Sequence, residues 1–151
     1  MVIVKQVNGD KKGMRDFLEL PYSLYKNDKN WCPPLRFERK EFFSKKNPFM
    51  KHSEVGFFVA YKDNQPIGRV TAHRDGIYDD FYNTRQGFFG FYESIEDDKV
   101  SGELMNSCEN WIKSRSTKSS SPKSNGRSRR WKHGAKPHGT RLRPLRNVST
   151  L

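Results

Sequence analysis

Residues 87–115 read GFFGFYESIEDDKVSGELMNSCENWIKSR, and this stretch decides the fold. The aromatic run at 87–93 predicts a buried β-strand, and the acidic residues that follow predict a bend. Apolar residues then recur at three- and four-residue spacing, which predicts an amphipathic helix ending near Arg115. This stripe consists of Val100, Leu104, Cys108, Trp111 and Ile112. A strand followed by a helix normally leads into another strand, and the sequence after Arg115 shows none.

The preceding residues predict a strand, two helices and a β-hairpin. The hairpin is the clearest of these signals, because two apolar runs flank the turn residues Asp63 to Pro66. The predicted elements are strand 2–7, a helix from Lys11 capped by Asp10, helix 35–43, and hairpin strands 55–62 and 67–73. Their order predicts an α+β fold with a mostly antiparallel sheet, flanked by helices and incomplete at its C-terminus.

The connections carry signals of their own. Pro21 lacks a backbone N–H and should kink or break the first helix. Residues 44–53 predict a polar loop, and residues 74–85 predict an exposed connection with Gly76 as a helix breaker. The residues of the second helix that we expect inside the protein are Leu35, Phe42 and Phe43.

The composition changes at about Arg115, which predicts a domain of residues 1–115 and a basic, low-complexity tail of residues 116–151. After residue 113 the chain has 11 of its 29 basic residues and none of its 17 acidic residues. The net charge of +12 therefore belongs mainly to the tail, and residues 1–113 carry only +1. Low hydrophobicity and charge of a single sign predict that the tail is disordered.

The cysteines and the apolar runs indicate a compartment. Cys32 and Cys108 have no metal-site or CxxC spacing and fit a reducing environment. The apolar run at residues 1–4 is too short for the core of a signal peptide. No stretch approaches the roughly 18 apolar residues of a membrane helix. We therefore expect a cytoplasmic protein that has no membrane partner.

Residues 67–73 (IGRVTAH) and the stretch 87–115 resemble the N-terminal half of GNAT-superfamily acyl-CoA N-acyltransferases, over about residues 1–115. NWCPPL at 30–35, followed by a short Phe-rich helix, is similar to a bacterial GNAT-like group. The resemblance implies a GNAT-like fold in which the strand at 87–93 and the next helix form the acyl-CoA site. It also implies acetyl-CoA as the donor, an amine as the acceptor, and a C-terminal part that is missing or replaced here.

The resemblance assigns the cofactor to the start of the last helix. In GNAT enzymes an Arg/Gln-x-x-Gly-x-Gly/Ala pattern places backbone N–H groups and a helix N-terminus against the pyrophosphate. The nearest match is residues 99–104 (KVSGEL), with Leu104 in place of the small residue. The cofactor residues so implied are Phe91, Lys99, Ser101 and Gly102. Asp97 and Asp98 would repel phosphates, and Gly102 also fits a tolerated glycine in a first helical turn.

Glu93 and Tyr92 are the candidate catalytic residues. A carboxylate in this region acts as general base in some GNAT enzymes, and burial would raise its pKa to suit that role. The alternative is a solvated acid at the end of a strand. Tyr92 would line the acyl pocket or, alternatively, pack in the core. His73 ends a hairpin strand and titrates near neutral pH, but a lone histidine is more often structural.

Three acidic residues, Asp75, Asp79 and Asp80, resemble a loose cation site, but their spacing fits no calcium-loop pattern. A solvated acidic loop is the simpler interpretation, and it would attract an amine substrate. The sequence contains no P-loop, no Gly-x-Ser-x-Gly and no GxGxxG motif. We therefore expect no metal site.

Three hypotheses account for the basic tail. In one, a small α+β module binds nucleic acid through a basic arm, with salt-dependent phosphate contacts and a base stacked on tryptophan. The residues of that arm are Arg127, Arg129, Arg130, Trp131 and Lys132. In another, the tail is solvated and has no specific partner. In the third, it is translated out of frame, since it begins where a buried strand is due.

The out-of-frame hypothesis has a physical consequence. Without the next strand, the strand at 87–93 keeps an unpaired apolar edge, which favours aggregation. We then expect a destabilised, inactive fragment, and a soluble monomer that binds acetyl-CoA would contradict this. Sequencing the coding DNA tests the hypothesis, because an uninterrupted related frame in neighbouring genomes would exclude it.

Overall fold

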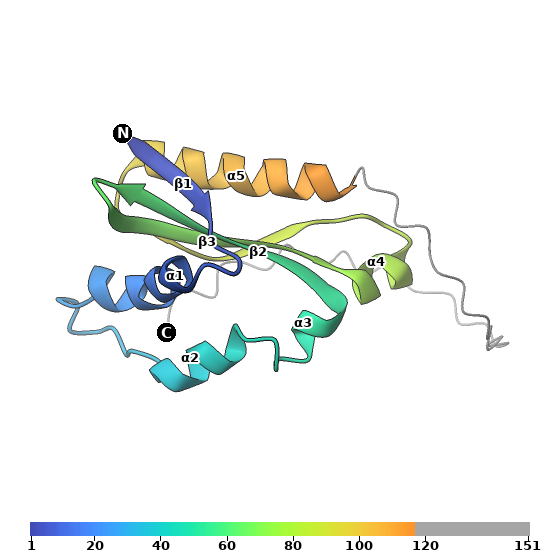
Figure 1. The fold of residues 1–151 in the computed structure, drawn as a ribbon, viewed down its shortest axis with the longest axis horizontal. Coiled ribbons are helices and arrows are strands. Elements are labelled where there is room, and N and C mark those ends of the chain that lie inside the picture. The colour runs from blue at the N-terminus through green and yellow to red at the C-terminus, as the bar shows by residue number, and fades with distance from the viewer. Residues whose placement is uncertain (117–151) are drawn as a thin grey trace, which may run out of the picture. The chain divides into compact units, whose positions relative to one another are not determined.

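A computed structural model describes residues 1–116 of the chain. The basic tail after Ser116, with the five candidate nucleic-acid residues, lies outside these described residues. Four antiparallel strands form one sheet in the order β1-β2-β3-β4 (Figure 1). The elements are β1 (Val2–Gln6), α1 (Lys11–Leu24), α2 (Arg36–Phe42), α3 (Phe49–His52), β2 (Ser53–Lys62), β3 (Gln65–Asp75), α4 (Gly76–Tyr82), β4 (Phe88–Ser94) and α5 (Asp98–Ser116). The predicted α+β class with an antiparallel sheet is confirmed.

The hairpin of β2 and β3 forms where the sequence predicts it. Asp63 and Asn64 make the turn with φ angles of 51° and 62°. These left-handed values suit a two-residue hairpin turn, and Asp and Asn tolerate them better than most side chains. A shift of register between Ala60 and Tyr61 then brings Pro66 opposite Tyr61. The hairpin is long, so it provides the surface on which helices from both sides pack.

Helices cover both faces of the sheet. Figure 1 shows α5 on one side and α1 with α2 on the other. The predicted stripe of α5 is confirmed, since four of its five residues are buried and Ile112 is partly buried. On the opposite face, Phe17 of α1 packs edge-to-face against Phe57 of β2 at 5.2 Å and against Phe43 at 5.4 Å. Aliphatic residues thus dominate one core and aromatic residues the other.

Pro21 lies inside α1 and does not break it, although a kink or a break was predicted at this residue. The helix continues to Leu24 with Pro21 inside it. Proline has no N–H, so the Phe17 carbonyl, four residues earlier, loses its helical donor. The Arg69 guanidinium of β3 takes that place, with Nη1 donating to the Phe17 oxygen at 2.6 Å. A tertiary hydrogen bond therefore replaces the missing helical one and lets the helix continue.

Two predicted loops contain helices. The prediction of a polar loop at 44–53 is wrong at its end, where α3 forms and β2 begins at Ser53. The connection at 74–85 is largely exposed, as predicted, but Gly76 does not act as a helix breaker, because α4 begins at this residue. Asp75 caps α4 by accepting from the backbone N–H of Ile77 at 3.0 Å. A good N-cap outweighs the low helix propensity of the glycine that follows it.

Some residues expected inside the protein are exposed. Leu35 is 56% exposed and Phe42 is 45% exposed, whereas Phe43 is buried as predicted. The strand predicted to be buried, β4, has Phe89 at 53% and Phe91 at 39% exposure. The cause is its place in the sheet, because β4 pairs with β3 and is the last strand of the described sheet. A terminal strand has a neighbour on one side only.

Candidate functional site

The candidate site is built around a bulge in β4. Thr71 pairs with Gly90, and further along Arg69 pairs with Glu93. Since β3 advances by two residues while β4 advances by three, β4 contains one extra residue. Phe91 lies in this bulge and has a φ of 49°, which is unusual for an aromatic residue. Strained residues of this kind concentrate at functional sites, and the bulge therefore marks this part of β4 as a candidate.

Glu93 lies just after the bulge in a largely buried position. Its side chain is 20% exposed, and Oε2 lies 3.0 Å from Nε of Arg69, whose side chain is 8% exposed. Both atoms are buried and are out of line for a hydrogen bond, so the contact is an ion pair. Burial raises the pKa of Glu93, and the charges of Arg69 and, less strongly, Arg39 oppose that rise. A largely buried carboxylate whose pKa lies above its usual value accepts a proton more readily than an ordinary glutamate does.

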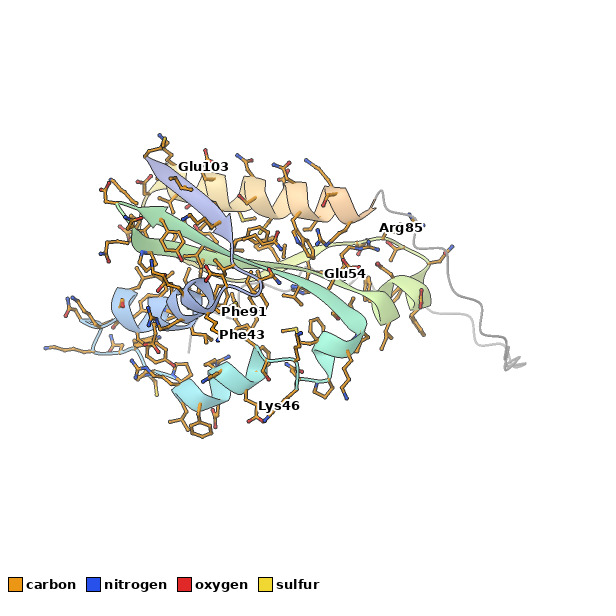
Figure 2. All side chains as sticks on the ribbon, viewed as in Figure 1. Phe43, Lys46, Glu54, Arg85, Phe91 and Glu103 are labelled. Atoms are coloured by element: carbon orange, nitrogen blue, oxygen red, sulfur yellow. The ribbon has the colours of Figure 1, made fainter. Side chains whose placement is uncertain are left out.

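Aromatic side chains border the same face of β4. Phe91 packs on Phe43, with ring centroids 4.8 Å apart, and on Phe42 at 5.7 Å. Figure 2 shows Phe91 and Phe43 together on the side of the sheet that carries α1 and α2. We call Phe42, Phe43 and Phe91 the aromatic wall. Since two of its three members are exposed, the wall offers an apolar surface, and Phe91 lies two residues before Glu93 in the same strand.

Tyr92 faces the opposite side of the sheet from Glu93. Its hydroxyl lies 2.6 Å from Ser101 Oγ and 3.1 Å from Ser94 Oγ. Its ring packs against the core beneath α5. The structure therefore does not bring the two predicted catalytic residues together. Tyr92 instead joins β4 to the first turns of α5.

The N-terminus of α5 is where the resemblance places the cofactor. A surface pocket of about 440 Å³ lies there, and Ser101 and Tyr92 line it together with Glu96, Asp97 and Asp98. The remaining lining residues are Ser94 and Ile95.

The residues at this pocket do not fit a pyrophosphate. The Asp97 carboxylate already accepts the backbone N–H of Lys99 at 2.9 Å, which occupies a donor that a phosphate would need. Lys99 itself is exposed, and it is not among the residues that line the pocket. A Cβ atom on Gly102 would meet no described atom within 4 Å, so this glycine forms no cradle for a ligand. Three carboxylates around the helix start would also repel an anion.

His73 and the acidic residues have structural environments. The His73 ring stacks on Phe88 and meets Phe49 edge-on, both at 5.7 Å, and burial lowers its pKa. Asp75 caps α4 and pairs with a histidine, while Asp79 binds Arg74 and accepts the N–H of Gln86. Among residues 1–116, no group of three or more His, Cys, Asp or Glu side chains could hold a metal ion.

Sequence reasoning missed Arg69, whose guanidinium links α1 to Glu93. The signal present in the sequence was a charged residue inside an otherwise apolar strand, IGRVTAH. An arginine at such a position is buried only when partners satisfy it, so it marks a polar contact that local patterns do not identify. Tyr25 was also missed. Burial and then the charge of Glu93 raise its pKa, which places it near the carboxylate.

The sheet, the bulged fourth strand and the following helix give the described part of the chain a GNAT-like fold. A solved structure, a probable acetyltransferase from Staphylococcus epidermidis, matches it with a TM-score of 0.50. The match covers 77% of this chain and 68% of that one, at 14% sequence identity. The resemblance predicted from the sequence is thereby confirmed at the level of the fold.

Two sequence relatives are bacterial proteins. The chain is 39% identical to Protein YghO of Escherichia coli over 105 residues, 70% of its length. It is 33% identical to the bacterial ceramide synthase of Caulobacter vibrioides over 104 residues, 68% of its length. The chain spans 27% of the length of each relative. No family model matches it. Within residues 1–116, no helix is both long and apolar enough to cross a membrane.

Proposed function

We propose that this domain binds the amine acceptor of a GNAT-like N-acyltransferase and that Glu93 is the general base of the reaction. The observation that carries the proposal is the position of Glu93, largely buried beside the bulge of β4 and with a raised pKa. An amine acceptor is protonated at neutral pH and must lose a proton before it can react. A carboxylate whose pKa lies above its usual value accepts that proton more readily.

The reaction removes two protons from the acceptor nitrogen, one before and one after the C–N bond forms. The ammonium group of the acceptor gives a proton to the Glu93 carboxylate, and the freed nitrogen attacks the carbonyl carbon of an acyl thioester. A C–N bond forms and the C–S bond breaks. The attacking nitrogen gives its second proton to the departing thiolate, and Glu93 releases the first proton to solvent. General base catalysis of this kind contributes typically about 10²–10⁴-fold to a rate. The surroundings of Glu93 exclude much of the solvent, which keeps the pKa of this carboxylate raised.

The aromatic wall favours an acceptor amine that carries an apolar body. Phe42 and Phe91 are 45% and 39% exposed, and Phe91 lies two residues before Glu93 in β4. A ceramide synthase, by its name, forms an amide of a long-chain amino alcohol, and the Caulobacter relative bears that name. We therefore propose a long-chain amine as the acceptor, with its alkyl part on the aromatic wall and its nitrogen at Glu93.

The donor is proposed to be an acyl thioester, with acetyl-CoA as the simplest member of the class that the fold implies. Its pyrophosphate would have to contact residues other than the N-terminus of α5, because three carboxylates surround that helix start. The chain spans 27% of the length of each relative. We therefore propose that the residues that bind the pyrophosphate lie, in these relatives, outside the matched region.

A small thioester donor tests the proposal without requiring a pyrophosphate site. We would incubate the 151-residue protein with an acetyl N-acetylcysteamine thioester and a medium-chain amine, and measure the amide by mass spectrometry. We expect a rate above the uncatalysed one that Glu93→Gln lowers by about 10²-fold. Glu103→Gln is the matched control, since Figure 2 shows Glu103 on the α5 side of the sheet. Equal rates for wild type and Glu93→Gln would contradict the proposal.

A further inference from the structure

Arg69 is an unusual residue for a central strand because it is charged and 6% exposed. Its guanidinium has two polar contacts in different directions. Nη1 donates to the backbone oxygen of Phe17 at 2.6 Å, and Nε lies 3.0 Å from Oε2 of Glu93. Its Cζ atom also lies 4.7 Å from the centroid of the Phe17 ring. One side chain therefore connects helix α1 with the carboxylate on β4.

The helix offers this contact because of Pro21. In an unbroken helix the N–H of residue 21 would occupy the Phe17 carbonyl, but proline has none. The carbonyl oxygen is thereby left for Arg69, which reaches it from β3. The order of contacts runs from Pro21 through the Phe17 carbonyl and Arg69 to Glu93. A single helix position, 72 residues before the carboxylate in sequence, thus acts on the surroundings of that carboxylate.

We propose that Arg69 is a positioning residue for Glu93 and that Pro21, by freeing the Phe17 carbonyl, fixes the orientation of Arg69. This inference rests on the proposed function, in which Glu93 is the general base. The planar guanidinium suits the task because the Nη1–H that it donates to the Phe17 carbonyl has a fixed direction, which holds the charge of the same group beside Glu93. A lysine would keep the charge and, as a point charge on a flexible stem, would not hold both contacts.

The charged and titratable groups around Glu93 set the direction of the expected change. Arg69 faces it from β3, Arg39 from α2, and Tyr25 from the end of α1. Burial raises the pKa of Glu93, and Arg69 is the strongest group that opposes this rise. When Arg69 moves away or loses its charge, the pKa of Glu93 should therefore rise further. Activity that needs the carboxylate form would shift to higher pH.

Carbon-13 NMR titration of the Glu93 carboxyl group tests the inference without any acyl transfer. The resonance is assigned by its loss in Glu93→Gln. We expect a higher pKa of Glu93 in Arg69→Met, where the charge is removed, and in Arg69→Lys, where the charge stays but the double contact is lost. We expect a rise in the same direction in Pro21→Ala, whose new N–H competes for the Phe17 carbonyl and changes no charge.

Pro21→Ala is the decisive variant. It restores a helical hydrogen bond, so it keeps the inference testable if the Arg69 variants fail to fold. A Glu93 pKa that stays at its wild-type value in Pro21→Ala would overturn the inference, because charge alone would then explain the Arg69 variants. Loss of the proposed activity in Glu93→Gln is a separate readout. The thioester assay can therefore fail while the titration succeeds. Failure of the proposed function is thus distinguishable from failure of the inference about Arg69 and Pro21.

Discussion

Glu93 makes stability depend on pH in a direction opposite to that of most carboxylates. Burial raises its pKa in the folded protein, so the folded state binds this proton more tightly than the unfolded state does. The stability that results is present below the usual pKa of glutamate and is lost as the pH rises through the raised value. Urea unfolding of wild type and Glu93→Gln between about pH 4 and pH 8 measures the difference. Identical pH dependence in the two proteins would contradict it.

Arg69 should contribute to stability as well as to the orientation of Glu93. In Arg69→Met the carboxylate would stay buried without its ion-pair partner, and the Phe17 carbonyl would lose its donor. Breaking a buried pair from one side typically costs about 3–5 kcal/mol. We expect a loss of that size in the free energy of unfolding, measured by urea titration. The double variant Arg69→Met, Glu93→Leu should recover part of this free energy, because both charges are then absent. If the effects of the two substitutions simply add, Arg69 and Glu93 are not coupled.

Single residues also show the limit of prediction from sequence. Glu93 was predicted as a candidate base through the resemblance to GNAT enzymes, some of which use a carboxylate at the end of this strand as general base. Its partner, Arg69, was not predicted, because the pair forms only when β3 and β4 align with a bulge between them. Pro21 was misjudged for the same reason, since the donor that replaces its missing bond comes from β3. Contacts between strands and helices that are distant in sequence determine the partner of Glu93 and the course of α1 at Pro21, and local propensity does not predict such contacts.

Gly68 lies in β3 beneath α5, and Gly102 lies on the exposed face of α5. Substitution by alanine should therefore have opposite effects at these two positions. A Cβ on Gly68 of β3 would lie 2.8 Å from Leu104 Cδ1 of α5, whereas a Cβ on Gly102 would meet no described atom. Gly102→Ala should raise the free energy of unfolding by about 0.5–1 kcal/mol, because alanine favours the helix. Gly68→Ala should lower it by about 1–3 kcal/mol through overpacking. Denaturant unfolding measures both, and equal signs would be inconsistent with this packing.

The exposed edge of β4 predicts self-association. Among the described strands β4 pairs with β3 alone, and Phe89 on it is 53% exposed. An apolar edge strand invites intermolecular pairing, and a lysine on it usually prevents this. Phe89→Lys should lower the fraction of aggregated protein in size-exclusion chromatography with light scattering. Phe81→Lys is the control, since it removes an aromatic residue that is 78% exposed on α4 and leaves the edge unchanged. Equal effects of both would argue against edge pairing.

Helices and strands were predicted well where a regular spacing of apolar residues along one segment is enough to define the element. The stripe of α5 and the two apolar runs of the hairpin define their elements without help from the rest of the fold. The sequence does not predict helix α4, because Gly76 indicates a break, whereas in the fold Asp75 caps a helix that begins at this glycine. The candidate cofactor residues show a similar limit. The spacing of residues 99–104 does not reveal that Asp97 already binds the backbone there.

The alternative proposal of nucleic-acid binding concerns the basic tail and predicts a measurement of its own. Residues 117–151 contain 10 basic and no acidic residues. Binding of single-stranded RNA through them should weaken steeply as salt is raised, because each phosphate contact releases counterions. Deleting residues 117–151 should abolish that binding. Fluorescence anisotropy at several salt concentrations measures the binding, and RNA affinity that survives the deletion would rule out the tail as its source.

Arg115, near the end of α5, has contacts with two strands. Its Nε lies 2.9 Å from Glu54 Oε2 of β2, and its carbonyl accepts Nη1 of Arg74 of β3 at 2.8 Å. Its guanidinium also lies 4.0 Å from the centroid of the Trp111 ring. In mechanical terms Arg115 is an anchor. A pulling force applied to the chain after residue 116 would load β2 and β3 through these contacts before it could peel α5 from the sheet one turn at a time.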